Sequence, residues 1–421
     1  PIAPPKFTPF QVTTGPSSAF TAVLKRVQRR LQQGVSPESA NEVVLLESGR
    51  DALSARLHLI ATAQKSIDYQ TFIWADDETG HILARALITA AKRGVKVRVL
   101  VDYIGIAKDA KSLAVVTRAH PNLEVRVYRP TARTLEGGMF ESIAYGLTNF
   151  KGANQRMHHK VLVVDNNIGI TGGRNVENSY FDHALSMNFK DRDALIVGPV
   201  AQSMTEVFSS FWQYRHTVPA IELHDVAQAK GEFDSKILAS PLGMKLIALE
   251  RQSKIPSTIR RSIVGNLRPI KHAEFISDLP GKNGALALSG GGRATAHILR
   301  ALEEAQQEVW IQSPYLVLGK KGLRYFRRFR KHHPNVTINI STNSFGSTDN
   351  LVAYAGNVRL RDRYVHEFGF NVSEYKPWPR DLRRVLPTYD WLASESKAIK
   401  ARPSFVCIHA KSFVVDDSLA F

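Results

Sequence analysis

Residues 157–165 read MHHKVLVVD, and residues 408–416 read IHAKSFVVD. Both stretches have the form His, any residue, Lys, four residues, Asp, and in both the lysine is followed by a run typical of a buried strand. One such pattern arises by chance in about one chain in thirty, and two at equivalent positions of a repeat arise far less often. The pair therefore indicates a duplicated fold with a functional motif in each copy.

Other segments of the chain also occur twice, in the same order. Residues 63–70 (AQKSIDYQ) match residues 305–312 (AQQEVWIQ), and the run VKVRVLV from Val95 matches VTINIST from Val336. The strand-like run that ends in Tyr-Arg-Pro at 128–130 recurs with Tyr-Lys-Pro at 375–377. Because these matches keep their order at a nearly constant offset, they predict an internal duplication.

Helical and strand-like segments alternate, which predicts an α/β fold. We expect two similar halves, each a mixed β-sheet flanked by helices, related by a pseudo-two-fold axis with the active site at their interface. The expected elements of the first half are helices at 54–65 and 81–92 and strands at 67–74, 95–101 and 123–128. The predicted domains are an N-terminal arm with one short helix, a first half, a connection and a second half, at 1–50, 51–224, 225–294 and 295–421.

Composition limits the possible partners. The 421 residues carry a net charge of +18, which favours a polyanion, either nucleic acid or an anionic membrane surface. The apolar runs are shorter than a spanning helix needs, so we expect membrane contact to be peripheral. A single cysteine, Cys407, excludes an internal disulfide and a Cys-rich zinc site. The chain begins without methionine, so we expect that an upstream signal or anchor was removed or left out.

The spacing within the motif suits phosphate chemistry. Alternation along a strand places His158 and Lys160 on one face and His159 on the other. An ammonium binds a phosphate oxygen, and a neighbouring imidazole can attack phosphorus or transfer a proton. Two copies around one phosphodiester would allow one histidine to form a phosphohistidine while the other acts as acid and base. This chemistry needs no metal ion or other cofactor, and the sequence shows no carboxylate cluster to hold one.

The paired motif resembles the signature of the phospholipase D superfamily. In that family six residues and then Gly-Gly or Gly-Ser, one residue and Asn follow the motif, as in Gly172-Gly173-Arg174-Asn175. The stretches DYQTFIW at 68–74, AAKRGV at 90–95 and TNS at 342–344 are similar to bacterial cardiolipin synthases of the C type and their phospholipase D-like relatives. Five residues follow Asp416, fewer than a second Gly-Ser-x-Asn requires, so we expect residues beyond Phe421.

The resemblance implies a role for each motif residue. It makes His158 the nucleophile and His409 the acid and base, although the opposite assignment stays open. Phosphate binding falls to five residues: Lys160, Lys411, Asn175, Gly172 and Gly173. Asp165 and Asp416 belong to the catalytic motifs, where we expect them to support the motif's architecture. Asp191 is expected to orient an active-site imidazole, with Asp193 as the alternative.

The resemblance also implies a function. We expect a phosphatidyltransferase that acts on phospholipids such as phosphatidylglycerol, phosphatidylethanolamine and cardiolipin, peripheral on a bacterial membrane. A phospholipase D that uses water as acceptor is the first alternative. A nuclease is the second, which the resemblance to a lipid-acting branch disfavours. Residues 133–150 and 377–405 could line an entrance for acyl chains or close the core, and the basic run at 324–331 could face anionic headgroups or solvent.

Overall fold

The computed structural model describes residues 8–137, 155–231, 236–281 and 292–420. The chain forms two compact units. The first comprises Pro1–Asn178 and Asp193–Gly284, and the second comprises Ser179–Arg192 and Ala285–Phe421. No helix in the described ranges is both long enough and apolar enough to cross a bilayer.

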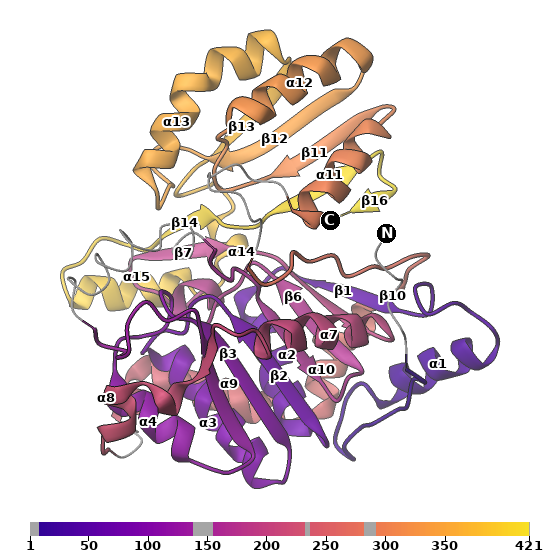
Figure 1. Cartoon of the computed structure of the whole chain (residues 1–421). Coiled ribbons are helices and arrows are strands. Elements are labelled where there is room, and N and C mark those ends of the chain that lie inside the picture. The colour runs from indigo at the N-terminus through magenta and orange to yellow at the C-terminus, as the bar shows by residue number, and fades with distance from the viewer. Residues whose placement is uncertain (1–7, 138–154, 232–235, 282–291, 421) are drawn as a thin grey trace. The chain divides into compact units, whose positions relative to one another are not determined.

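The first unit contains a nine-stranded mixed sheet in the order β10-β1-β8-β6-β5-β2-β3-β4-β9 (Figure 1). Its centre is the parallel set β2, β3 and β4, with β5 antiparallel to β2. The strands are β1 (Glu42–Leu46), β2 (Ser66–Thr71), β3 (Lys96–Asp102), β4 (Leu123–Tyr128), β5 (Val161–Val164), β6 (Ile168–Gly172), β8 (Asp193–Val197), β9 (Thr217–Pro219) and β10 (Arg268–Pro269).

Helices connect and cover this sheet. The helix that follows β2 begins at the cap residue Asp77, whose carboxylate accepts a hydrogen bond from the Gly80 amide. Another helix packs Met204 against Val161 and Val163 of β5. The helices are α1 (Thr21–Gln32), α2 (Gly49–Thr62), α3 (Glu78–Lys92), α4 (Ala110–Arg118), α7 (Val200–Trp212), α8 (His224–Gln228), α9 (Pro241–Ser253) and α10 (Pro256–Ser262).

The second unit contains a five-stranded sheet in the order β13-β12-β11-β15-β16 and a separate parallel pair, β7 with β14 (Figure 1). Phe326 and Phe329 pack against Val309, Ile338 and Ile340 in its core. The strands are β7 (Met187–Lys190), β11 (Glu308–Gln312), β12 (Thr337–Asn343), β13 (Phe370–Tyr375), β14 (Phe405–Ile408), β15 (Ser412–Val415) and β16 (Leu419–Ala420). The helices are α11 (Arg293–Glu303), α12 (Lys320–His332), α13 (Leu351–Asp362), α14 (Leu382–Val385) and α15 (Tyr389–Ala398).

The duplication is visible in the topology. In the first unit, three parallel strands stand in the order β4-β3-β2, and β5 adds to β2 in the antiparallel direction. The second unit repeats this as β13-β12-β11 with β15 antiparallel to β11. The predicted fold class, two similar α/β halves with mixed sheets flanked by helices, is confirmed at this level.

The compact units differ from the predicted domain ranges. The segment Ser179–Arg192 lies in the second unit although it was predicted within the first half, because β7 pairs with β14. The described part of the predicted connection up to Gly281 packs in the first unit, where Leu246 and Ile259 are buried. The predicted N-terminal arm contains β1 as well as α1, since the apolar run EVVLL pairs with β8.

Candidate active site

The four residues between Lys and Asp in each motif are one short strand. They form β5 in the first copy and β15 in the second. Each strand then turns back through a loop of three residues, 165–167 or 416–418. The first two residues of each loop, Asp165 and Asn166 or Asp416 and Asp417, have positive φ. The motif is therefore a strand with its histidine and lysine at one end and its aspartate at the other.

The motif aspartates are acceptors for backbone amides. The Asp165 carboxylate accepts hydrogen bonds from the amides of residues 64, 65 and 66, at 2.6–3.2 Å. Asp416 accepts from the amides of residues 306, 307 and 308, at 2.7–2.9 Å. Five residues of strand separate Lys160 from Asp165 by about 16 Å. Both aspartates thus join their hairpin to the start of the neighbouring strand, far from the histidine end.

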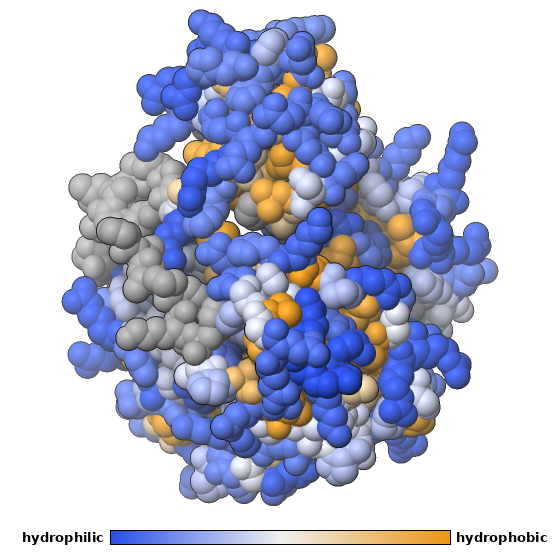
Figure 2. Space-filling model, turned by 90° about the vertical axis from the view of Figure 1, so that its right-hand side faces the viewer, coloured by the Kyte–Doolittle hydropathy of each residue, from blue (hydrophilic) through white to orange (hydrophobic). Residues whose placement is uncertain are grey.

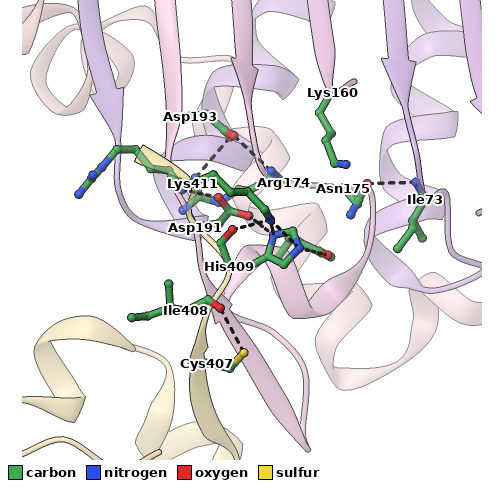
Figure 3. A network of polar contacts seen from close by, with 12 residues as sticks. Ile73, Lys160, Arg174, Asn175, Asp191, Asp193, Cys407, Ile408, His409 and Lys411 are labelled. Atoms are coloured by element: carbon green, nitrogen blue, oxygen red, sulfur yellow. Dashed lines mark hydrogen bonds and ion pairs between the residues drawn. The ribbon is translucent and has the colours of Figure 1, made fainter. Parts of the chain in front are cut away.

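The hairpin returns the Gly-Gly-x-Asn sequence to the histidine end of the first copy. Val161 pairs with Thr171, so the residues that follow β6 run alongside residues 158–160. Arg174 points into the protein, where its guanidinium donates to the carbonyls of Leu46 and Glu47. The Asn175 side chain holds its position by accepting a hydrogen bond from the Ile73 amide at 3.1 Å (Figure 3).

The two predicted glycines lie at this turn. Gly172 is the last residue of β6, where it pairs with Asp193 of β8, and it is exposed. Gly173 follows it and is half-buried. The structure therefore brings His158, Lys160 and the Gly172–Asn175 turn to the same end of one hairpin, which we call the first half-site.

In both copies the lysine ammonium contacts the histidine two residues before it. The Lys160 Nζ lies 2.9 Å from the His158 carbonyl oxygen and 3.2 Å from His158 Nδ1. The Lys411 Nζ lies 2.7 Å from the His409 carbonyl oxygen and 2.9 Å from His409 Nε2. The local geometry of His-x-Lys is thus repeated, and each copy presents an ammonium and an imidazole together.

The intervening histidine of the first copy lies elsewhere, as predicted. The His159 ring packs on Phe211 of α7, and its Nε2 is 2.7 Å from the Ser277 hydroxyl. His158 instead packs on Phe72, with 4.8 Å between ring centroids. His159, which precedes β5, therefore contacts α7 and lies apart from the first half-site.

The second half-site forms around His409, which is buried. Its Nδ1 is 2.6 Å from the Asp191 carboxylate, and its ring contacts Tyr180 and Phe189. Figure 3 shows Asp191, His409 and Lys411 directed toward one another. An acceptor at Nδ1 holds the proton there, which leaves the lone pair on Nε2. The structure thus brings Asp191 into hydrogen-bond contact with the imidazole of His409.

Strand pairing explains how Asp191 reaches His409. The strand β7, which ends one residue before Asp191, pairs in parallel with β14, which ends one residue before His409. The amides of His409 and Ala410 both donate to the Lys190 carbonyl. These backbone bonds align the two strand ends, so the carboxylate and the imidazole meet.

The alternative candidate, Asp193, forms ion pairs with two arginines. It is fully buried, at 2.9 Å from the guanidinium of Arg56 and 3.4 Å from that of Arg174. Its carboxylate neutralises two buried cations within the first unit. Of the two candidates, Asp191 contacts the His409 imidazole and Asp193 contacts two guanidiniums.

Two groups beside His409 have shifted pKa values. Partial desolvation lowers the pKa of Lys411 to about 8, although the charges of Asp191 and Asp349 oppose this shift. Lys411 as a whole residue is nonetheless exposed. Burial raises the pKa of the Cys407 thiol to about 12, which makes this residue a packing element.

Two segments were predicted to line an entrance for acyl chains or to close the core, and the structure describes one of them and only the start of the other. In the segment 377–405, Leu386 is fully buried and packs with Leu382 and Leu392, whereas half of the Trp378 side chain is exposed. Most of the segment 133–150, including Met139 and Phe140, lies outside the described residues. Among the described residues, no group of three or more His, Cys, Asp or Glu side chains could hold a metal ion.

Sequence reasoning missed the aromatic side chains around the histidines. Phe72 contacts the ring of His158 and lies 5.3 Å from the Lys160 ammonium. Tyr180 and Phe189 surround His409, and the Tyr180 hydroxyl is 3.5 Å from its Nε2. Phe72 lies in the quoted DYQTFIW stretch and could have been found there, but Tyr180 and Phe189 have no local signal.

Comparison of this chain with known proteins identifies its family. The family model "Cardiolipin synthase, PLD-like domain" matches residues 57–212. Cardiolipin synthase B of Shigella flexneri is 30% identical over 360 residues, covering 83% of this chain and 71% of that protein. Cardiolipin synthase C of Escherichia coli K12 is 29% identical over 388 residues, covering 89% and 76%. An uncharacterized protein of Helicobacter pylori J99 is 34% identical over 386 residues, covering 89% and 71%.

The chain therefore belongs to the phospholipase D superfamily, a family of phosphatidyltransferases and phosphodiesterases, with cardiolipin synthases among its relatives. A crystal structure of the phosphatidylserine synthase of Haemophilus influenzae shares its fold, with a TM-score of 0.54 at 13% identity over 92% of this chain and 80% of the other. A phospholipid-modifying function is supported at the level of the family.

Proposed function

We propose that this protein is a cardiolipin synthase-like phosphatidyltransferase that works through a phosphohistidine. The observation that carries the proposal is the repeated His-x-Lys geometry, in which each ammonium lies within 3.2 Å of an imidazole nitrogen. In this geometry the ammonium can bind a phosphate oxygen while the imidazole reacts at the phosphorus atom. The similarity to cardiolipin synthases B and C supports phospholipids as the substrates.

The proposed reaction has two displacements on one phosphodiester. In the first, an imidazole nitrogen of His158 attacks the phosphorus of phosphatidylglycerol, and the bond from phosphorus to the glycerol headgroup breaks. His409, in its protonated form, gives its proton to the departing glycerol oxygen. The products of this step are a phosphatidyl-histidine and glycerol, while Lys160 and Lys411 stabilise the negative charge on phosphate.

In the second displacement a hydroxyl of another phosphatidylglycerol attacks the phosphatidyl-histidine. His409 takes the proton of that hydroxyl, the bond from phosphorus to nitrogen breaks, and cardiolipin forms. Asp191 supports both steps, because its contact with Nδ1 favours the protonated imidazole and keeps Nε2 in place. Asn175 holds a phosphate oxygen beside Lys160 in this scheme.

We further propose that the protein acts as a peripheral protein on an anionic membrane. The face in Figure 2 is predominantly hydrophilic, and the charge of +18 favours an anionic surface. The polar side of α12 carries five exposed cations, and no described carboxylate forms an ion pair with any of them: Lys320, Lys321, Arg324, Arg328 and Lys331. Other cations of this helix are structural, because Arg327 pairs with Glu367 and Arg330 donates to the carbonyls of Phe368 and Val336.

The test incubates the purified chain with vesicles of phosphatidylglycerol, alone and mixed with phosphatidylethanolamine, followed by lipid mass spectrometry. We expect cardiolipin, and a phosphatidyl-histidine in the peptide that contains His158 after rapid quenching. His158→Ala and His409→Ala should each abolish turnover. His159→Ala is the matched control, since His159 lies between His158 and Lys160 in the chain but its ring contacts Phe211.

Other outcomes separate the alternatives. Phosphatidic acid without cardiolipin would show that water is the acceptor and would make the protein a phospholipase D. Cleavage of single-stranded DNA without turnover of lipid would show that the protein is a nuclease. Turnover in either histidine variant would refute the two-step mechanism.

A further inference from the structure

The two units hold the residue before each catalytic histidine in the same way. Asp102 is the last residue of β3, and its carboxylate accepts a hydrogen bond from the Met157 amide at 2.9 Å. Asn343 is the last residue of β12, and its side-chain oxygen accepts from the Ile408 amide at 2.7 Å. Met157 and Ile408 directly precede His158 and His409.

Asp102 and Asn343 occupy equivalent positions. The strands β3 and β12 are the middle members of the two parallel sets, and both are seven residues long. The residues that follow also match, because the Tyr103 amide donates to the Tyr128 carbonyl and the Ser344 amide donates to the Tyr375 carbonyl, each at 3.2 Å. The contact to the histidine strand is therefore part of the duplicated architecture.

In the first unit a carboxylate and a guanidinium make the contact together. Asp102 is fully buried, and one of its oxygens accepts from Arg156 Nε at 2.9 Å. The same guanidinium donates to the carbonyls of Tyr128 and Arg129, at 3.1 and 3.0 Å. The residues before His158 are thus joined to the ends of both β3 and β4.

In the second unit an amide makes the contact alone. Asn343 is 1% exposed, and its side-chain nitrogen donates to the Ile408 carbonyl at 2.8 Å while its oxygen accepts from the Ile408 amide. A carboxylate offers only acceptors and needs a cation to complete its bonds, whereas an amide offers a donor and an acceptor. The two halves therefore achieve the same backbone position with different chemistry.

We propose that Asp102 and Asn343 are positioning residues for the two active-site histidines. Each fixes the backbone at the residue before its histidine, so the imidazole leaves the strand end at a defined position. A shift of about 1 Å in a reacting group can cost about 100-fold in rate. The role in turnover rests on the proposed function, while the backbone constraint itself does not.

The test compares four variants in the full chain: Asp102→Ala, Asp102→Asn, Asn343→Ala and Asn343→Asp. We expect Asp102→Ala and Asn343→Ala to lower kcat by about 10- to 100-fold with little change in KM. Asp102→Asn keeps an acceptor for the Met157 amide and should recover part of kcat. Asn343→Asp should recover less, because it places a carboxylate against the Ile408 carbonyl.

Asp68→Ala is the matched control. Asp68 is 3% exposed on β2 and forms a two-point ion pair with Arg98, at 2.7 and 2.8 Å, without contacting residues 155–160. It should destabilise the first unit as Asp102→Ala does, but leave kcat within about twofold of the wild type when both are assayed well below their unfolding midpoints.

Two readouts separate this inference from the proposed function. Turnover is measured on phosphatidylglycerol and on bis(p-nitrophenyl) phosphate, which reports phosphodiester chemistry if the lipid assignment is wrong. Hydrogen exchange of the Met157 and Ile408 amides needs no substrate, and each should accelerate only in the variant of its own partner. Unchanged exchange together with unchanged kcat in Asp102→Ala and Asn343→Ala would overturn the proposal, and so would an equal loss of kcat in Asp68→Ala.

Discussion

Replacement of Asp165 tests whether the last residue of the motif has a structural or a catalytic role. Its carboxylate accepts hydrogen bonds from three backbone amides, and the residue has a φ of +52° in the turn after β5. A hydrogen bond to a charged group contributes about 1.5–3 kcal/mol when its donor is left without a partner. Gln64 and Lys65 are exposed, so their amides can turn to water, while the Ser66 amide is half-buried.

The expected cost follows from these contacts. Asp165→Ala loses the bond to the Ser66 amide in full and the two bonds to the Gln64 and Lys65 amides in part, because water replaces them. Alanine at positive φ costs about 1 kcal/mol more, so the free energy of unfolding should fall by about 4 kcal/mol in total. Asp165→Asn keeps a residue that tolerates positive φ and retains one acceptor, so about 2 kcal/mol is expected. Asp416→Ala should cost less than Asp165→Ala, because Asp416 is half-buried whereas Asp165 is buried.

Urea unfolding of the full chain measures the free energy of unfolding, and hydrogen exchange of residues 64–66 assigns the loss to the first unit. Below its midpoint, each variant should keep a kcat within about threefold of the wild type, since about 16 Å of strand separates Asp165 from Lys160. A loss of kcat above about 100-fold with an unchanged free energy of unfolding would refute this reasoning and make Asp165 a catalytic residue.

Three further predictions concern the charged groups. Asp191→Asn should lower kcat by about 100-fold or more, because the amide no longer favours the protonated His409 imidazole; quench-flow on vesicles measures this. Lys411 has a pKa of about 8, so its cationic form and the turnover it supports are present below pH 8 and are lost as the pH rises through 8; Lys411→Arg should remove this alkaline limb of kcat if the arginine supports turnover. Asp193→Ala leaves the guanidiniums of Arg56 and Arg174 buried without their carboxylate and should lower the free energy of unfolding by about 3–5 kcal/mol in urea.

The local elements of the site were predictable from sequence because each has a local cause. β4 at Leu123–Tyr128 matches the predicted strand, and the predicted helix at 81–92 lies within α3. Alternation predicted that His159 would face away from His158 and Lys160, and its ring does contact α7 although residues 158–160 precede β5. The motif's repetition predicted the duplicated topology.

The long-range pairings were not predictable in the same way. β7 pairs with β14 although more than 200 residues separate them, and neither strand shows in its own residues which partner it takes. Asp191 was found through resemblance, whereas its partner His409 follows only from that pairing. Asp102 and Asn343 were missed because a polar residue at the end of a strand is common, and its bond to Met157 or Ile408 depends on how the next hairpin packs.

The constant spacing of the motif has a physical reason in these contacts. The strand β5 is held at its start by the bond from Met157 to Asp102 and at its end by the bonds that Asp165 accepts from residues 64–66. The strand β15 is held by Asn343 and Asp416 in the same manner. Because both ends are fixed to neighbouring strands of set length, one inserted residue would move either the histidine or the turn and would reverse the faces of the side chains between them. The residues inside the strand can therefore differ, VLVV in one copy and SFVV in the other, while their number stays at four.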